Sequence, residues 1–206
     1  MPCSLEHEHR LARQGIFPIA GVDEAGRGPL AGPVVAAAVI LPENFCGGPL
    51  DDSKKLSTAT REECYKRLTD SEEVIWAVGV CEVDLIDRIN ILRAAHEAMR
   101  QAVAGLRIAA AHALIDGLPV QPFAVPQTAL VGGDGISLSI AAASVIAKVT
   151  RDRLMLEHAA KWPHYGFERH KGYATPEHLA SLEKHGPCPI HRRSFAPVAQ
   201  MVLPLN

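Results

Sequence analysis

The chain has 206 residues, of which 48% are hydrophobic and 21% charged, with a formal net charge of −2. This indicates a soluble globular protein with one full core and a small appendage. No transmembrane helix is expected, because no window approaches the roughly 18 apolar residues of a spanning helix. The first 15 residues are polar and lack the apolar stretch of a signal peptide, so we expect a cytoplasmic protein.

The five cysteines are odd in number, widely spaced and contain no Cys-x-x-Cys pair. This spacing argues against a zinc knuckle or a disulfide framework and favours a reducing compartment. We expect all five to be buried or incidental thiols: Cys3, Cys46, Cys64, Cys81 and Cys188.

In chain order, residues 19–22 are expected to form a strand that ends before the loop Ala25-Gly26-Arg27-Gly28-Pro29. A continuous apolar run at 34–41 predicts a buried strand, a helix is expected at 58–68, and a third strand at 74–80. Apolar residues at a 3.6-residue period predict one helix over 89–106. Short strands at 113–115 and 129–131 follow.

A long helix over 137–160 and a helix over 176–185 complete the expected elements. Thr175 is the predicted N-cap of the last helix, with Pro176 at its first position. This order predicts an α/β fold with a mixed sheet. We expect a polar segment at 1–17, a main α/β domain at 18–160, a helical extension at 161–198 and a tail at 199–206.

Charge is unevenly distributed along the chain. Residues 145–206 contain nine Lys or Arg and five Asp or Glu, a net charge of +4, whereas the rest carries −6. A basic region beside an acidic body suits a polyanion held against carboxylates, although a solvated face is the ordinary alternative.

Four acidic residues lie at or after predicted strand ends, with a glycine close behind. They are Asp23, Glu24, Asp116 and Asp134. Any one alone would be a turn or cap residue, but crowded carboxylates at strand ends persist mainly where a cation neutralises them. An all-oxygen ligand set predicts Mg²⁺ or Mn²⁺. Because adjacent strand residues face opposite ways, Asp23 and Glu24 share this site only if the backbone turns there, which Gly26 permits.

The loop Gly26-Arg27-Gly28 lacks the Gly-Lys-Ser/Thr ending of a P-loop, and the chain has no Gly-x-Gly-x-x-Gly. We therefore do not expect a nucleotide-binding fold. Glycines there allow close backbone approach to a ligand, and Arg27 can bind phosphate with two hydrogen bonds.

The segment Gly21-Val22-Asp23-Glu24-Ala25-Gly26-Arg27-Gly28-Pro29-Leu30-Ala31-Gly32-Pro33-Val34 closely resembles the opening signature of bacterial ribonuclease HII. Five further motifs resemble the same family in the same order: Asp52-Ser53-Lys54-Lys55-Leu56-Ser57, Leu114-Ile115-Asp116-Gly117, the run from Gly133-Asp134 through Ser139 to Asp152, His170-Lys171-Gly172-Tyr173-Ala174-Thr175, and His191-Arg192-Arg193-Ser194-Phe195. The likeness covers roughly residues 18–198.

The resemblance implies a ribonuclease H-like fold, with a five-stranded mixed sheet flanked by helices and a C-terminal helical extension. It implies an endonuclease that cuts the RNA strand of RNA–DNA hybrids and the 5′ side of ribonucleotides embedded in duplex DNA. It assigns Asp23, Glu24, Asp116 and Asp134 to two Mn²⁺ or Mg²⁺ ions, with 5′-phosphate and 3′-hydroxyl products.

The resemblance also implies that backbone groups of Gly26, Arg27 and Gly28 contact a ribose 2′-hydroxyl. Tyr173 matches a tyrosine that packs on the sugar at an RNA–DNA junction. Ala174 departs from the commoner Gly-Tyr-Gly-Thr pattern, from which we expect only a small change in loop flexibility.

Several basic residues have two interpretations. Lys54, in a serine-containing loop, either contacts phosphate or is a solvated lysine. Lys148 and Arg151 either reach phosphate or lie on the surface, and Asp152 is expected to pair with Lys148 at i,i+4.

Three alternatives stay open. A ribonuclease HIII-like enzyme would usually carry an extra N-terminal domain and a different residue at Arg27, and a non-catalytic hybrid-binding protein would not need four acids. A metal-dependent phosphatase would need an Asp-x-Asp nucleophile, which is missing.

The tail Gln200-Met201-Val202-Leu203-Pro204-Leu205 resembles peptides that dock into bacterial sliding clamps. Its ordinary alternative is packing on its own domain. We expect a monomer.

Overall fold

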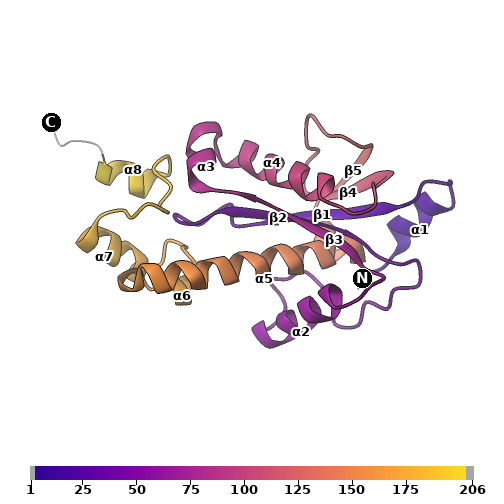
Figure 1. Cartoon of the computed structure of the whole chain (residues 1–206), viewed down its shortest axis with the longest axis horizontal. Coiled ribbons are helices and arrows are strands. Elements are labelled where there is room, and N and C mark those ends of the chain that lie inside the picture. The colour runs from indigo at the N-terminus through magenta and orange to yellow at the C-terminus, as the bar shows by residue number, and fades with distance from the viewer. Residues whose placement is uncertain (1–2, 203–206) are drawn as a thin grey trace.

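The computed structural model describes residues 3–202, which form one central sheet with helices on both faces (Figure 1). The strands are β1 (Ile19–Ala25), β2 (Val34–Ile40), β3 (Ile75–Cys81), β4 (His112–Asp116) and β5 (Gln127–Leu130). Their order is β3-β2-β1-β4-β5, with β1, β2 and β3 antiparallel and β4 and β5 parallel to β1. The predicted five-stranded mixed sheet is therefore confirmed.

The helices are α1 (Glu6–Ala12), α2 (Thr58–Thr69), α3 (Val83–Ile89), α4 (Ile91–Ala104), α5 (Leu138–Lys161), α6 (Phe167–His170), α7 (Pro176–His185) and α8 (Ala196–Val202), with short 3₁₀ turns η1 (Gly133–Gly135) and η2 (Pro163–Tyr165). In Figure 1, α4 lies above the sheet and the long α5 below it, with α2 beneath α5. No helix among the described residues is long and apolar enough to cross a membrane.

Strand periodicity divides the core between the two faces. On β2, the even-numbered Val34, Ala36, Ala38 and Ile40 pack with α4, whereas Ala37 and Val39 pack with α5. Strand β1 follows the same rule, because Ala20 and Val22 belong to the cluster on the α4 side. Odd-numbered residues of β1 consequently face α5.

Helix α5 approaches β1 more closely than a side chain permits. A Cβ on Gly21 would lie 2.1 Å from the backbone carbonyl carbon of Ser139. The start of α5 is also apolar or small throughout, with Ala141, Ala142 and Ala143 fully buried. This close packing fixes the start of α5 against the middle of the sheet.

The N-terminal segment, which the sequence suggested only as polar, contains helix α1. Its Glu8 is buried and accepts hydrogen bonds from the Ser137 hydroxyl (2.6 Å), the Ser139 hydroxyl (2.6 Å) and the Ser139 amide (3.1 Å). Ser137 is the N-cap of α5, with its hydroxyl 3.3 Å from the Ile140 amide. A carboxylate at a helix N-terminus is favourable, so α1 secures the end of α5 nearest Asp134.

The single helix predicted over 89–106 was wrong at its start. The structure has two helices, α3 and α4, separated at Asn90, whose φ is 70°. The Asn90 side chain accepts a hydrogen bond from the Arg93 amide at 3.1 Å and so caps α4. Asparagine adopts a positive φ more often than most non-glycine residues, and the chain leaves the helical conformation at this position.

After α5 the chain continues through η2, α6, α7 and α8, which lie at the left end of Figure 1. Leu30 and Met155 join Tyr165, Phe167 and Leu182 in one buried cluster there. Helix α7 has the predicted bounds, and Thr175 caps it by accepting from the His178 amide at 3.2 Å.

Candidate active site

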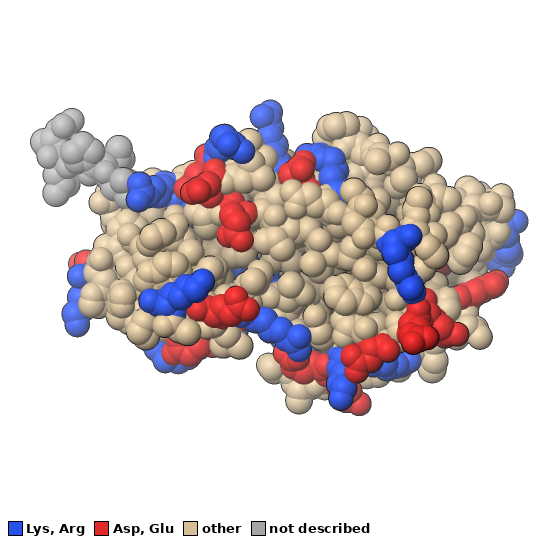
Figure 2. Space-filling view, viewed as in Figure 1, with Lys and Arg blue, Asp and Glu red and all other residues tan. Residues whose placement is uncertain are grey.

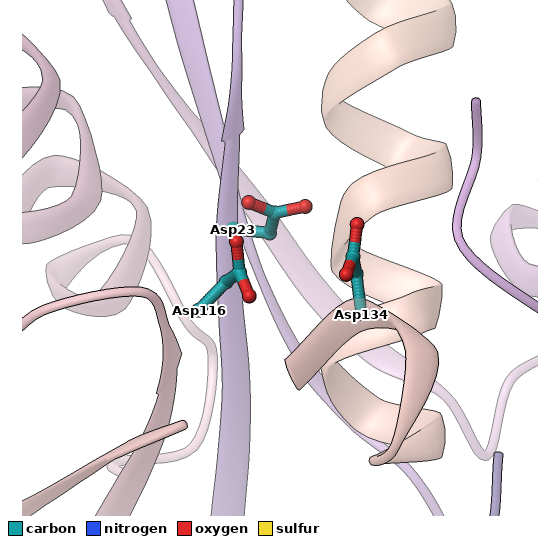
Figure 3. Close-up of side chains that lie close together, drawn as sticks. All are labelled: Asp23, Asp116 and Asp134. Atoms are coloured by element: carbon teal, nitrogen blue, oxygen red, sulfur yellow. The ribbon is translucent and has the colours of Figure 1, made fainter. Parts of the chain in front are cut away.

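Three carboxylates from distant parts of the chain converge on one side of the sheet. Figure 3 shows Asp23, Asp116 and Asp134 pointing toward one another. Each contributes a carboxylate oxygen to a group in which all three atoms lie within 4.8 Å of one another. Asp23 and Asp134 are buried, with 4% and 7% of their surfaces exposed.

The position of each carboxylate follows from the strand or turn that carries it. Asp23 is odd-numbered on β1 and so faces α5, while Asp116 is the last residue of the neighbouring parallel strand β4. Asp116 accepts a hydrogen bond from the Gly133 amide at 2.7 Å. That bond ties the end of β4 to the 3₁₀ turn that carries Asp134.

Glu24 is not a member of the group of three. Strand β1 continues through Ala25, so the backbone does not make the turn on which a shared position of Asp23 and Glu24 depended. The two side chains leave opposite faces of the strand. Glu24 lines a small pocket with Arg27, His96 and Asp116. Its carboxylate accepts from the Arg27 guanidinium at 3.1 Å.

The cluster is electrostatically costly without a cation. Burial raises the pKa of Asp23 well above its ordinary value, and the charges of Glu24 and Asp116 raise it further. Burial also raises the pKa of Asp134, as do the charges of Asp116 and Asp52. The pKa of Glu24 is raised by burial against the opposing effect of Arg27. Hard divalent cations suit such an all-oxygen donor set.

Lys54 is the basic residue predicted to contact phosphate, and it lies at the rim of this cluster. Its ammonium nitrogen is 3.7 Å from a carboxylate oxygen of Asp134, and the side chain is largely exposed. Burial lowers the pKa of Lys54, but the nearby charges of Asp134 and Asp23 outweigh it and raise the pKa overall. The loop of Lys54 is held to α5 by a hydrogen bond of 2.8 Å between the hydroxyls of Ser53 and Ser144.

Comparison with known proteins decides the family. The family model described as Ribonuclease HII matches residues 20–198. The chain belongs to the ribonuclease HII family. Ribonuclease HII of Pelotomaculum thermopropionicum is 53% identical over 194 residues, which cover 93% of this chain and 73% of that protein. That of Myxococcus xanthus is 53% identical over 196 residues, covering 95% and 67%.

Solved structures agree on the fold. The ribonuclease H2 of Pyrococcus horikoshii superposes with a TM-score of 0.73 at 28% identity, covering 89% of this chain and 96% of that one. A PCNA:RNase HII complex from Archaeoglobus fulgidus gives 0.68 at 27% identity, covering 85% and 94%. The ribonuclease H-like fold is therefore confirmed, and the ribonuclease HII family is one of metal-dependent endonucleases.

The glycine loop of this ribonuclease HII chain lies against the segment that carries Tyr173. The Leu30 amide donates to the Gly172 carbonyl at 2.8 Å, and a Cβ on Gly28 would lie 3.7 Å from the Tyr173 ring. Arg27 is largely exposed, and Tyr173 is 45% exposed. Of the predicted nucleic-acid contacts in this region, Arg27, Gly28 and Tyr173 are exposed, whereas Gly26 is buried beneath them.

Arg151 corrects one sequence interpretation. It was expected at phosphate or on the surface, but it is buried and donates to the carbonyls of Ala31, Pro33 and Lys171 at 3.0 to 3.1 Å. The predicted i,i+4 ion pair between Lys148 and Asp152 is confirmed, at 2.7 Å.

Arg192 is likewise buried, so two of the nine cations in residues 145–206 do not contribute to a surface patch. Figure 2 shows basic and acidic side chains interspersed on the visible face. Acidic side chains gather along its lower edge, near α2 and the loop before it. The charge imbalance in the sequence therefore does not translate into one uniform basic face in this view.

Sequence reasoning missed Glu8, Ser144 and the role of Arg192. Ser144 and Arg192 lie within the quoted family motifs. Nothing in a single sequence, however, distinguishes a buried arginine from an exposed one. For Glu8, the helical spacing of Leu5, Glu8 and Leu11 was the available signal, since all three are buried.

Proposed function

We propose that the chain hydrolyses the RNA strand of RNA–DNA hybrids and cuts on the 5′ side of ribonucleotides embedded in duplex DNA. The products would carry 5′-phosphate and 3′-hydroxyl ends. The observation that carries the proposal is the convergence of Asp23, Asp116 and Asp134 within 4.8 Å in a ribonuclease HII chain. Like charges this close in a buried site favour a bound cation over an empty cluster.

Asp23, Asp116 and Asp134 would hold Mn²⁺ or Mg²⁺, with Glu24 completing the set from the other face of β1. The donors fit, because all are carboxylate oxygens. Among residues 3–202, the cations paired with them are Lys54, beside Asp134, and Arg27, beside Glu24. Two divalent ions there would activate water and stabilise the leaving oxygen. The all-oxygen set disfavours zinc, which prefers nitrogen and sulfur.

The chain's own residues would orient the substrate. Lys54 and Arg27, both largely exposed, flank the carboxylates and can contact phosphates on either side of the cut. Backbone groups of Gly26, Arg27 and Gly28 would contact the ribose 2′-hydroxyl, with Tyr173 packed on the adjoining sugar. This arrangement explains why a ribonucleotide, and not a deoxyribonucleotide, would be cut.

The test is cleavage-site mapping on a DNA duplex that contains one ribonucleotide, with Mg²⁺, with Mn²⁺ and with a chelator. We expect a single cut on the 5′ side of the ribonucleotide that requires metal, and no cut in the matched all-DNA duplex. Asp23→Asn should abolish turnover and still bind the duplex. Substantial cleavage by a folded Asp23→Asn variant, or metal-independent cleavage, would contradict the proposal. Binding without any cleavage would favour a non-catalytic hybrid-binding protein.

The C-terminal tail supports a second, separate proposal. A related archaeal enzyme is known in complex with PCNA, and this chain ends with an apolar segment led by Gln200. Helix α8 includes Gln200 and Met201, whereas residues 203–206 lie outside the described part of the structure. We propose that residues 200–205 bind a sliding clamp. Deleting residues 200–206 should abolish clamp binding and leave cleavage of a short free duplex unchanged.

We also propose that the enzyme acts as a monomer in the cytoplasm. All five cysteines are free thiols, and three of them are buried, which suits a reducing compartment. Sedimentation of the purified chain tests the first point; a dimer at micromolar concentration would contradict it.

A further inference from the structure

Two buried guanidinium groups lie directly beneath the glycine loop. Arg151 and Arg192 have 1% and 0% of their surfaces exposed. Arg192 donates to the carbonyls of Gly26 (2.6 Å), Arg27 (3.0 Å) and Gly32 (2.8 and 3.0 Å), and at 3.2 Å to that of Pro33. Among residues 3–202, no carboxylate forms an ion pair with either arginine.

These bonds set the direction in which the loop presents its backbone. In a trans peptide the carbonyl and the following amide point in opposite directions. Because the carbonyls of Gly26 and Arg27 point inward to Arg192, the amides of Arg27 and Gly28 point away from it. Neither amide donates to another group in the described part of the chain. The loop therefore presents two consecutive free donors, the arrangement that binds oxygen atoms of a ligand.

The conformation of Gly26 is part of the same device. Its φ is +100°, and a Cβ there would lie 2.1 Å from Nε of Arg151. Arg151 also donates to the Lys171 carbonyl at 3.1 Å, two residues before Tyr173. The free amides of Arg27 and Gly28 therefore lie beside Tyr173, since the Tyr173 ring is 3.7 Å from the Cβ position of Gly28.

We propose that Arg192 is a positioning residue for ribose recognition, which turns the carbonyls of Gly26 and Arg27 inward so that the amides of Arg27 and Gly28 face the substrate sugar. The proposal rests on the proposed function, and it explains the residue type. A guanidinium has five donors in a planar fork and serves four carbonyls at once. A lysine ammonium keeps the charge but has only three donors on a single atom, so it cannot serve all four carbonyls.

The test compares Arg192→Lys with Tyr165→Phe, both in the Asp23→Asn background so that bound duplex is not cut. Tyr165→Phe is the matched control, because it removes one partly buried hydrogen bond, from Tyr165 to the Gly186 carbonyl, in the same C-terminal extension. Fluorescence anisotropy measures the affinity for a duplex with one ribonucleotide and for the same duplex with deoxyribose at that position. Circular dichroism melts confirm that each variant is folded at the assay temperature.

We expect Arg192→Lys to lower the ribo-to-deoxy affinity ratio about tenfold, which corresponds to the loss of one or two hydrogen bonds. Affinity for the all-DNA duplex should change less than about twofold, and Tyr165→Phe should keep the parent ratio. A folded Arg192→Lys variant with the parent ratio would overturn the inference and leave the proposed function intact. A parent protein with no preference for ribose would instead refute the proposed mode of recognition.

If Arg192→Lys does not fold, Phe195→Leu takes its place. The Arg192 guanidinium packs over the Phe195 ring at 5.0 Å, so this change loosens the arginine and keeps its donors. We then expect about a threefold lower ribo-to-deoxy ratio, and an unchanged ratio would refute the role of Arg192.

Discussion

Replacing Asp23 by asparagine should stabilise the metal-free protein while removing its response to metal. Asp23 is buried, and its carboxylate oxygen lies within 4.8 Å of oxygens from Asp116 and Asp134. Asparagine keeps the shape and can still accept the Glu24 amide hydrogen bond, which is 2.7 Å long in the wild type. The substitution therefore removes charge and leaves packing nearly unchanged.

The size of the effect follows from Coulomb's law. Two unit charges 4.8 Å apart repel by about 3.5 kcal/mol at an effective dielectric constant near 20. The wild-type cluster relieves part of this by binding protons, since burial and the neighbouring charges raise the pKa of Asp23. We expect Asp23→Asn to raise the metal-free free energy of unfolding by about 1 to 3 kcal/mol. With metal at 100 times its dissociation constant, the free energy of unfolding of the wild type should rise by about 2.7 kcal/mol. That of the variant should rise by little or nothing.

Urea unfolding in a chelator and in Mn²⁺ or Mg²⁺ measures both quantities without any activity assay. Asp70→Asn, an exposed change at the end of α2, is the control and should alter neither value. If the variant is less stable than the wild type in chelator, the Asp23 carboxylate stabilises the metal-free protein, and the prediction is wrong. A wild type without any metal-dependent stabilisation would remove the electrostatic basis of the site.

Three further predictions concern other parts of the chain. Glu8→Ala should lower the free energy of unfolding by about 2 to 4 kcal/mol, because it removes the acceptor shared by the Ser137 hydroxyl, the Ser139 hydroxyl and the Ser139 amide. Urea unfolding measures this change, and a loss below about 1 kcal/mol would contradict it. Burial lowers the pKa of His191 from 6.5 to about 4. The unfolded chain therefore binds this proton first as the pH falls, and the His191 contribution to stability, complete above pH 6.5, should decline by about 1.4 kcal/mol per pH unit down to about pH 4. Subtracting the pH profile of His191→Gln isolates this contribution, and parallel profiles would argue against it. Lys54→Ala should reduce the slope of log affinity against log salt for a duplex by about 1, whereas Lys184→Ala on α7 should leave it unchanged; equal slopes would exclude a phosphate contact by Lys54.

The sequence predicted the elements whose periodicity is strong. The apolar run at 34–41 became β2, buried on both faces, and the capped helix at 176–185 became α7 with the same bounds. In both cases local signals agree with the tertiary environment. The acids after the strands could also be identified, because Asp116 and Asp134 follow short apolar runs and lie beside glycines. The run before Asp116 is buried, whereas β5, before Asp134, is only half-buried.

Other features depended on contacts between distant residues. The end of β1 could not be placed from Gly26 alone, since pairing of Glu24 with Ala36 and of Ala25 with Val35 extends the strand past the two acids. Arg151 and Arg192 look like surface cations in a sequence, because charged residues are seldom fully buried. Only the folded chain shows that both donate to backbone carbonyls of the loop between β1 and β2, and that Arg151 also donates to the Lys171 carbonyl.

Strand β1 couples the two halves of the proposed activity. Asp23 and Gly26 are three residues apart on and just beyond a central strand, which spans about 10 Å at roughly 3.3 Å per residue. A sugar held by the Gly26–Gly28 loop is thus set at a fixed offset from the carboxylates, because hydrogen-bonded strands on both sides of β1 prevent it from sliding. Arg192 controls the orientation of the loop and contacts none of the three clustered acids, whereas Asp23 belongs to that cluster and does not touch the loop amides. Recognition and hydrolysis should therefore be separable by mutation even though one strand carries both.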